Sequence, residues 1–171
     1  KQDYPMAEEN TPETAAAGES QRQFALRNVY IKDLSFEAPN TPEIFRQEWK
    51  PETNLQLDIK LQQLAEDAHE VTLTVTATTK VEDKTAYIVE VQQAGIITAS
   101  GIPSNELGPL FYIYAPGLLF PYARQSVADM VGKGGFPNLM LQHVNFDAIY
   151  AQKMAEQQQA AAEKPEGETA H

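Results

Sequence analysis

A stretch of strict alternation in the middle of the chain constrains the fold more than any other feature. Between residues 71 and 78, apolar side chains alternate with threonines. The apolar set is Val71, Leu73, Val75 and Ala77, and the threonines are Thr72, Thr74, Thr76 and Thr78. Because successive side chains of a β-strand point to opposite faces, the pattern predicts a strand with one buried and one polar face. Such a strand belongs in a sheet that is covered on one side.

Three further segments, 24–37, 55–62 and 85–99, carry the same two-residue period and predict the rest of the sheet. The polar residues 82–84 join the last two strands as a hairpin, and Gly95 predicts a bulge in the final strand. Only a short helical turn at 43–46 interrupts the series of strands. The sequence therefore predicts an α+β fold, with a four-stranded antiparallel sheet and helices packed on one side.

Two amphipathic helices are predicted after the strands. The first begins at Pro121 and ends at the glycines that follow Val131. The second begins after Asn145, whose side chain can cap it. We expect an irregular segment over 103–117, because prolines and a glycine interrupt its apolar centre.

The two ends of the chain are rich in Glu, Ala, Thr, Gln and Pro and poor in large apolar residues. Such segments cannot offset the entropy cost of becoming ordered. We therefore expect a disordered tail over 1–23, one folded domain over 24–155 and a disordered acidic tail over 156–171. A chain of 171 residues has room for one domain with a true core.

Charge and composition argue against several classes of function. The 24 acidic side chains outnumber the 13 basic ones and give a net charge of -11, which disfavours nucleic acid and favours basic partners. The chain has no cysteine, so disulfides, thiolate zinc sites and thiol nucleophiles are excluded, as fits a cytoplasmic protein. No apolar run is long enough to span a membrane and no signal-peptide core stands at the start, so we expect neither membrane insertion nor secretion.

Side chains that could carry catalysis are scattered. The histidines His69, His143 and His171 show no metal-ligand spacing, and the chain has no phosphate-binding loop or nucleophile motif. We therefore expect no enzyme activity, no metal site and no cofactor. An enzyme whose site forms between subunits stays as a weaker alternative.

An acidic strand face is the first candidate for a binding surface. The two-residue period places Asp33 and Glu37 on one face of the first strand, about 13 Å apart, which is too far to share a proton or a metal ion. Ile88 and Glu90 share a face of the fourth strand. The two faces together would form an acidic surface with an apolar spot, although an ordinary solvated sheet face gives the same pattern. The other face of the first strand would carry Tyr30, Lys32, Leu34 and Phe36.

Aromatic side chains beside the proline-rich connections form the second candidate. The group comprises Phe36, Phe45, Trp49, Phe111, Tyr112, Tyr114, Phe120 and Tyr122. Apolar walls next to irregular loops can make a groove for an extended peptide. Core packing is the commoner role of any single aromatic residue, and both interpretations stay open from the pattern alone.

Five segments, in this order and spacing, resemble the SecB family of bacterial protein-export chaperones. They read YIKDLSFEAPN at 30–40, WKP at 49–51, EVQQAG at 90–95, LFPYAR at 119–124 and VNFDA at 144–148. The resemblance implies a homotetramer, a dimer of dimers, that binds unfolded precursor proteins without ATP. It also implies that the protein keeps these clients competent for translocation and delivers them to the ATPase SecA.

The resemblance also implies roles for individual residues. SecA would dock on Asp33, Glu37, Ile88 and Glu90. Clients would bind a groove at Trp49, Leu55 and Leu57, with Phe120 and Tyr122 as weaker candidates. The family uses the strand that carries Val89, Val91 and Gln93 near its subunit contacts. The sequence departs from the family in lacking the cysteines of many members and in the apolar character of 103–117.

An acidic oligomeric adaptor is the main alternative to a chaperone. Such a module would bind one folded partner and leave unfolded chains alone. A test for suppressed aggregation of an unrelated denatured protein separates the two.

Overall fold

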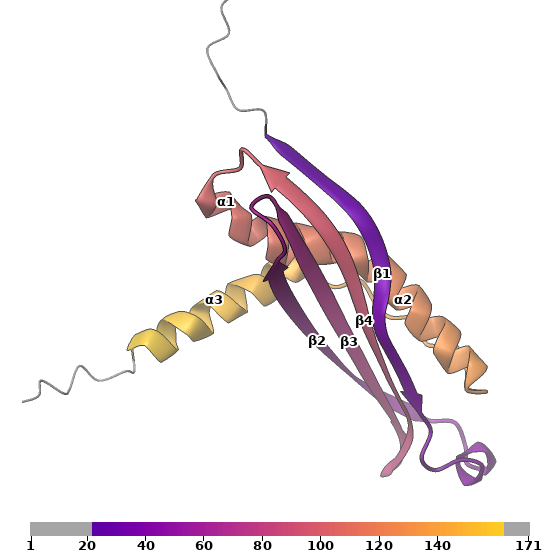
Figure 1. Cartoon of the computed structure of the whole chain (residues 1–171). Coiled ribbons are helices and arrows are strands. Elements are labelled where there is room, and N and C mark those ends of the chain that lie inside the picture. Colours follow the sequence, from indigo (N-terminus) through magenta and orange to yellow (C-terminus); the bar gives the residue numbers. More distant parts are fainter. Residues whose placement is uncertain (1–21, 163–171) are drawn as a thin grey trace, which may run out of the picture.

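The computed structural model describes residues 22–162, which form one antiparallel sheet with helices on one side (Figure 1). The strands are β1 (Gln23–Glu37), β2 (Pro51–Gln63), β3 (Ala68–Val81) and β4 (Lys84–Ser100), in the order β1-β4-β3-β2. The short helix η1 (Glu43–Arg46) lies between β1 and β2. The predicted α+β fold is confirmed. Nearly all of the tail expected over 1–23, and the chain beyond 162, lie outside the described residues.

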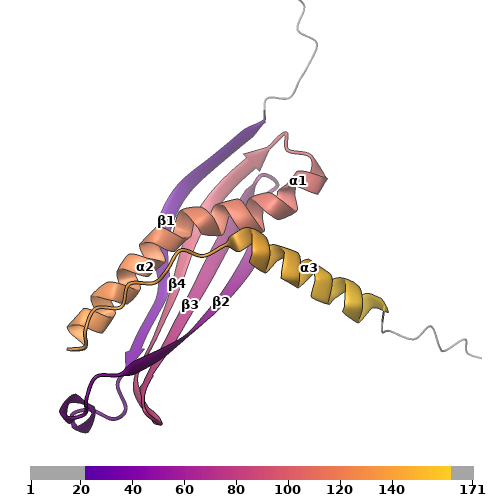
Figure 2. The same cartoon turned by 180° about the vertical axis from the view of Figure 1, so that it is seen from behind.

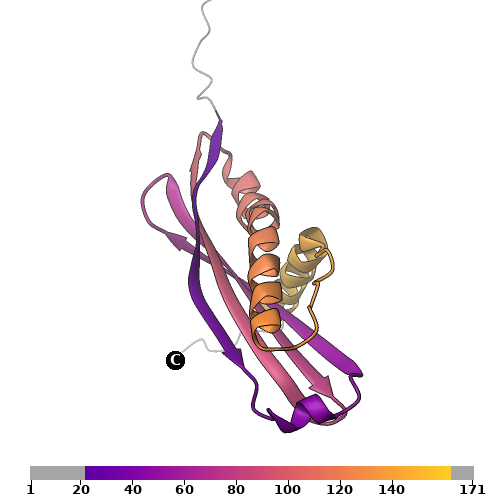
Figure 3. The same ribbon diagram turned by 90° about the vertical axis from the view of Figure 1, so that its right-hand side faces the viewer.

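The helices follow the sheet as α1 (Ser104–Pro109), η2 (Leu110–Tyr114), α2 (Ala115–Lys133) and α3 (Phe146–Ala162). Figures 2 and 3 show that α2 and α3 lie on the same side of the sheet and that the other face is open. We call these two sides the helix face and the open face. α2 packs mainly on β4 and β3.

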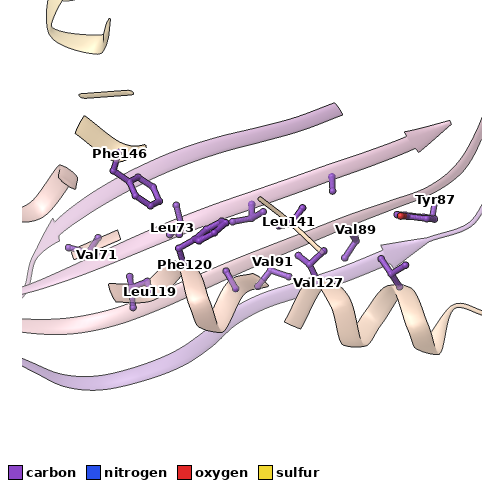
Figure 4. Close-up of a cluster of buried hydrophobic side chains, with 14 of the residues drawn as sticks. Val71, Leu73, Tyr87, Val89, Val91, Leu119, Phe120, Val127, Leu141 and Phe146 are labelled. Carbon is purple, nitrogen blue, oxygen red and sulfur yellow. The ribbon is translucent and has the colours of Figure 1, made fainter. Parts of the chain in front are cut away.

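The helix face of the central strands forms the core (Figure 4). Val89 and Val91 of β4 and Leu119 and Val127 of α2 are all fully buried there. Each such side chain contributes about 1.5–3 kcal/mol to folding through the apolar surface that it removes from water. The strict alternation of β3 over 71–78 has the same origin, because the apolar residues of that stretch lie in this core and its four threonines on the open face.

The prediction of an irregular segment over 103–117 is wrong. Residues 104–133 are helical throughout, and the segment changes to a π-helix at Leu110–Tyr114. The wider π-turn follows Pro109, and Pro116 comes directly after it, at the second position of α2. Pro121, predicted as the first residue of a helix, lies inside α2. Burial of Phe111 and Leu119, which are 2% and 0% exposed, favours the helix over the local preference of the prolines.

The helix α3 continues to Ala162, past residue 155, where the sequence predicts that order ends. The added segment is rich in Gln and Ala, which have high helix propensity. Asn145 begins the helix as expected, because its side-chain oxygen accepts a hydrogen bond from the backbone N–H of Ala148 at 3.1 Å.

Two β-bulges lie in β1, whereas the bulge predicted at Gly95 in β4 is absent from the pairing of the described strands. The register shifts at Arg27 and at Lys32, each of which is an extra residue without a partner on β4. Tyr30 therefore lies opposite Ala94 and Asp33 opposite Gln92, so both side chains are on the open face. The expectation that Tyr30 shares a face with Leu34 and Phe36 is wrong, because the extra residue reverses the alternation.

Candidate functional site

The acidic surface is the set Asp33, Glu37, Ile88 and Glu90, and all four side chains lie on the open face. Glu37 pairs directly with Ile88, and Glu90 pairs with Ser35, between the two acidic positions of β1. Asp33 and Glu37 are exposed, and Ile88 and Glu90 are partly exposed. The sheet therefore brings together three carboxylates from two strands around one apolar side chain, as the sequence predicted.

One carboxylate of the acidic surface is held by a neighbouring strand. The Thr76 hydroxyl of β3 donates a hydrogen bond to Glu90 Oε2 at 2.8 Å. Asp33 and Glu37 stand on β1, the strand at the edge of the sheet. Exposed carboxylates that are gathered on a flat face favour contact with a basic partner, and the attraction is screened by salt.

A second polar group on the open face joins β1 to β3. The Tyr30 hydroxyl and the Lys32 ammonium both donate hydrogen bonds to the Glu70 carboxylate, which is 9% exposed. The hydrogen bond from Lys32, followed by that from Tyr30, holds the pKa of Glu70 below its ordinary value, although burial opposes this. The hydrogen bond to Glu70 and burial together raise the pKa of Tyr30 to about 12.

An aromatic cluster closes the helix face at the end where η1 and the carboxyl end of α2 meet. Its members are Phe36, Phe45, Trp49, Tyr87 and Phe136. The ring of Phe136 is the hub, with centroid distances of 4.9 Å to both Phe45 and Tyr87 and 5.8 Å to Trp49. Phe45 is 52% exposed and Trp49 is partly exposed, so the cluster presents aromatic surface to the outside.

An apolar stripe runs from this cluster along β2. We call the residues Leu55, Leu57, Ile59 and Leu61 the β2 stripe; all four lie on the helix face and are partly exposed. They are partly exposed because α2 packs mainly on β3 and β4 and leaves the edge strand less covered. Leu57 and Ile59 line a hollow of about 290 Å³ whose other wall is formed by Ile149 and Lys153 of α3.

The predicted client residues fall into two places. Trp49, Leu55 and Leu57 belong to the aromatic cluster and the β2 stripe. Phe120 is 4% exposed, packs edge-on against Phe146 and lines a different hollow beside α2, of about 470 Å³. Tyr122 is 52% exposed. A direct contact with clients is therefore better supported by the geometry for the first three residues than for Phe120.

Val89, Val91 and Gln93, the residues predicted near a subunit contact, have buried side chains. They are 0%, 0% and 2% exposed on the helix face of β4, so they contact the rest of their own chain. The Gln93 side-chain amide donates a hydrogen bond at 2.9 Å to the Tyr30 carbonyl, beside the second bulge. Their place near a subunit contact stays a prediction.

Sequence reasoning missed Phe136, Ile59 and Leu61 as parts of the apolar surface. Ile59 and Leu61 continue the alternation that begins at Leu55, so the period itself could have identified them. Phe136 follows two glycines after α2, and no local pattern links it to β1 or η1. Only the return of the chain over the end of the sheet brings it there.

Neither His69 nor His143 belongs to the acidic surface, the aromatic cluster or the β2 stripe. The His69 ring packs on Phe111 at 4.6 Å, His143 is exposed beside α2, and His171 lies outside the described residues. No group of three or more His, Asp or Glu residues that could bind a metal ion occurs within 22–162. None of the helices in that range is both long and apolar enough to cross a membrane.

Comparison with known proteins gives consistent matches over most of the chain. A family model described as preprotein translocase subunit SecB matches residues 17–157. The protein-export protein SecB of Nitrosococcus oceani is 53% identical over 159 residues, which are 92% of this chain and 97% of the relative. The protein of the same name from Methylococcus capsulatus is 50% identical over 156 residues, which are 91% and 96% of the two chains.

A solved structure has a similar fold. It is a Mycobacterium tuberculosis SecB-like chaperone in complex with a ChAD peptide from the HigA1 antitoxin, with a TM-score of 0.61. The match covers 71% of this chain and 91% of that chain, at 14% sequence identity. At this identity the similarity supports the fold alone.

Proposed function

The chain belongs to the SecB family of protein-export chaperones, and we propose that it is an ATP-independent holdase that delivers unfolded precursor proteins to SecA. One observation carries the proposal: the two faces of the sheet are unlike. The acidic surface lies on the open face, and the β2 stripe and the aromatic cluster lie on the helix face. A client and SecA would then bind opposite sides of one sheet, and both could be bound at the same time.

The β2 stripe and the aromatic cluster suit a client without native structure. An unfolded chain presents apolar side chains at irregular spacing, so an extended apolar surface can accept many sequences. Each buried client side chain contributes about 1.5–3 kcal/mol before the cost of ordering, so single contacts are weak. We propose that a homotetramer, a dimer of dimers, joins several such surfaces and gains affinity from multivalent binding.

Holding a client in this way needs no nucleotide. A protein that binds the unfolded state competes by mass action with folding and with aggregation. Release would come from the partner rather than from ATP hydrolysis by this chain. We propose that both events take place in the cytoplasm.

SecA is the proposed partner of the acidic surface. Asp33, Glu37 and Glu90 present three carboxylates around Ile88, a combination that suits a basic segment with one apolar side chain. The basic, metal-stabilised carboxyl-terminal tail of SecA would be that segment. The M. tuberculosis SecB-like chaperone was solved with a bound peptide, which supports the capacity of this fold for peptide binding.

A light-scattering assay tests the holdase proposal. The purified protein, without nucleotide, should suppress aggregation of an unrelated denatured protein at near-stoichiometric amounts. An acidic adaptor for one folded partner would leave aggregation unchanged, and that result would reject the holdase. The mass in solution, measured by light scattering after size exclusion, should be that of four chains.

A further inference from the structure

The two bulges of β1 place two cations on the open face. Arg27 and Lys32 are the unpaired extra residues. Arg27 Nε donates a hydrogen bond to Thr98 Oγ1 at 3.1 Å, and Lys32 donates one to Glu70. Lys32 directly precedes Asp33 in the chain, so the side chain that carries this ammonium group begins beside the acidic surface.

Glu70 draws this ammonium away from the acidic surface. Glu70 pairs with Ile96 of β4, whereas the acidic surface is centred on Ile88 and Glu90 of the same strand. Four residues of strand, about 13 Å, separate Ile96 from Gln92, which lies opposite Asp33, and six residues, about 20 Å, separate it from Glu90. Both distances exceed the screening length at physiological ionic strength, which is about 8 Å. An ammonium bound to Glu70 therefore adds little to the potential at the acidic surface.

The surroundings of Glu70 favour its contact with Lys32. The carboxylate is 9% exposed and accepts hydrogen bonds from Lys32, Tyr30 and, at 3.3 Å, from the Thr72 hydroxyl. Ala94 lies between β1 and β3 at this point, opposite both Tyr30 and Thr72, and is 0% exposed although it is on the open face. The small side chain leaves room for the Lys32 stem to cross β4.

We propose that Glu70 is a positioning residue for partner docking, because it neutralises Lys32 and keeps that ammonium away from Asp33 and Glu37. The inference rests on the proposed docking of SecA. Without the Glu70 charge, the Lys32 ammonium returns to the vicinity of Asp33 and repels a basic partner. One unit charge about 6 Å away in water changes the affinity about threefold.

The test is a charge cycle measured with purified SecA. Glu70→Gln removes the charge but keeps the shape and an acceptor oxygen. We expect SecA binding, measured by calorimetry at low salt, to weaken about threefold, and the difference to shrink at higher salt. The double variant Lys32→Gln/Glu70→Gln should return to the affinity of the unaltered protein. Glu66→Gln is the matched control, because Glu66 is exposed, follows β2 and carries the same charge.

Three outcomes would overturn the inference. Glu70→Gln could bind like the unaltered protein, its loss could persist in the double variant, or Glu66→Gln could lose as much affinity. The second outcome would mean that Glu70 acts through stability, which the unfolding temperature of each variant would also reveal. If charge reversal of Asp33 and Glu37 leaves binding intact, the docking proposal itself fails, and that result is distinct from the other three.

Discussion

Phe36 packs so closely on Gly134 that a Cβ atom added to the glycine would lie 2.3 Å from the ring Cζ atom. The ring cannot easily move aside, because it stacks on Tyr87 at 5.8 Å and also contacts Phe136. We predict that Gly134→Ala lowers the free energy of unfolding by about 1–3 kcal/mol, the usual cost of overpacking. Unfolding in urea, monitored by circular dichroism, measures this change in the free energy of unfolding.

Gly132→Ala is the control for this change. Beyond the neighbouring backbone of its own helix, no atom lies within 4 Å of a Cβ added at Gly132, which is exposed within α2. Since alanine favours the helix over glycine, this variant should raise the free energy of unfolding by up to about 1 kcal/mol. Equal effects at the two positions would contradict the role of the contact with Phe36.

Charge reversal of the acidic surface should abolish partner docking. In Asp33→Lys/Glu37→Lys, two exposed carboxylates become ammonium groups beside Glu90, and the attraction for a basic segment turns into repulsion. We predict at least a tenfold loss of SecA affinity, with suppression of client aggregation unchanged. The control, Glu66→Lys/Asp67→Lys, reverses the same charges in the turn after β2 and should bind SecA nearly normally. Loss of both activities together would contradict the separation of the two faces.

Stability should depend on pH through the Tyr30–Glu70–Lys32 group. The lowered pKa of Glu70 means that its contribution is present above its ordinary value of 4.5 and is lost as the pH falls below it. The raised pKa of Tyr30 means that its contribution is present below pH 10 and is lost as the pH rises toward about 12. Unfolding free energies across this range measure both effects.

Variants separate the two ends of this pH profile. Tyr30→Phe should reduce the loss of stability between pH 10 and 12, and Glu70→Gln should reduce the losses at both ends. Part of the alkaline loss should persist in both variants, because burial also raises the pKa of Tyr87. An unchanged alkaline profile in Tyr30→Phe would show that its hydroxyl does not contribute.

Client binding should depend on the helix face of β2 and be indifferent to its open face. Leu57→Asp places a carboxylate on the β2 stripe, at the hollow below α3, and we predict at least a tenfold weaker suppression of aggregation. Gln56→Asp places the same group one residue away, on the open face opposite Thr76, and should leave suppression unchanged. The light-scattering assay measures both. Equal losses would indicate that clients do not bind along the β2 stripe.

Much of the fold could be predicted from the sequence because the strands alternate so regularly. In β3, the apolar residues of the stretch 71–78 all point to the helix face, and burial then determines the register with β4. The helical segment from Ser104 was not predictable in this way, because its prolines disfavour a helix locally and only tertiary packing of Phe111 and Leu119 reverses that preference.

The bulges of β1 show what a two-residue period alone cannot reveal. The helix-face residues of β1 are Phe24, Leu26, Val29, Ile31, Leu34 and Phe36. Their spacing alternates between two and three, and each step of three contains a bulge. This alternating spacing is visible in the sequence, but it cannot be assigned to bulges until the pairing with β4 is known. The acidic positions were predicted on the correct face because Asp33 and Glu37 both follow the second bulge.

Within residues 22–162, the helix α3 is attached to the rest of the chain near one end only. The helix is tied down near its start, where Tyr150 stacks on Tyr112 and Lys153 lies 5.2 Å from the centre of the Tyr112 ring. Residues 154–159 are exposed, and the far end points away from the sheet (Figure 2). The tip at Ala162 lies about 18 Å beyond Tyr150 along the axis, so a tilt of about 10° moves it by about 3 Å. Ile149 and Lys153, which form one wall of the hollow over β2, lie within about 5 Å of Tyr150 along the axis, so the same tilt moves them by less than about 1 Å and the hollow keeps its width.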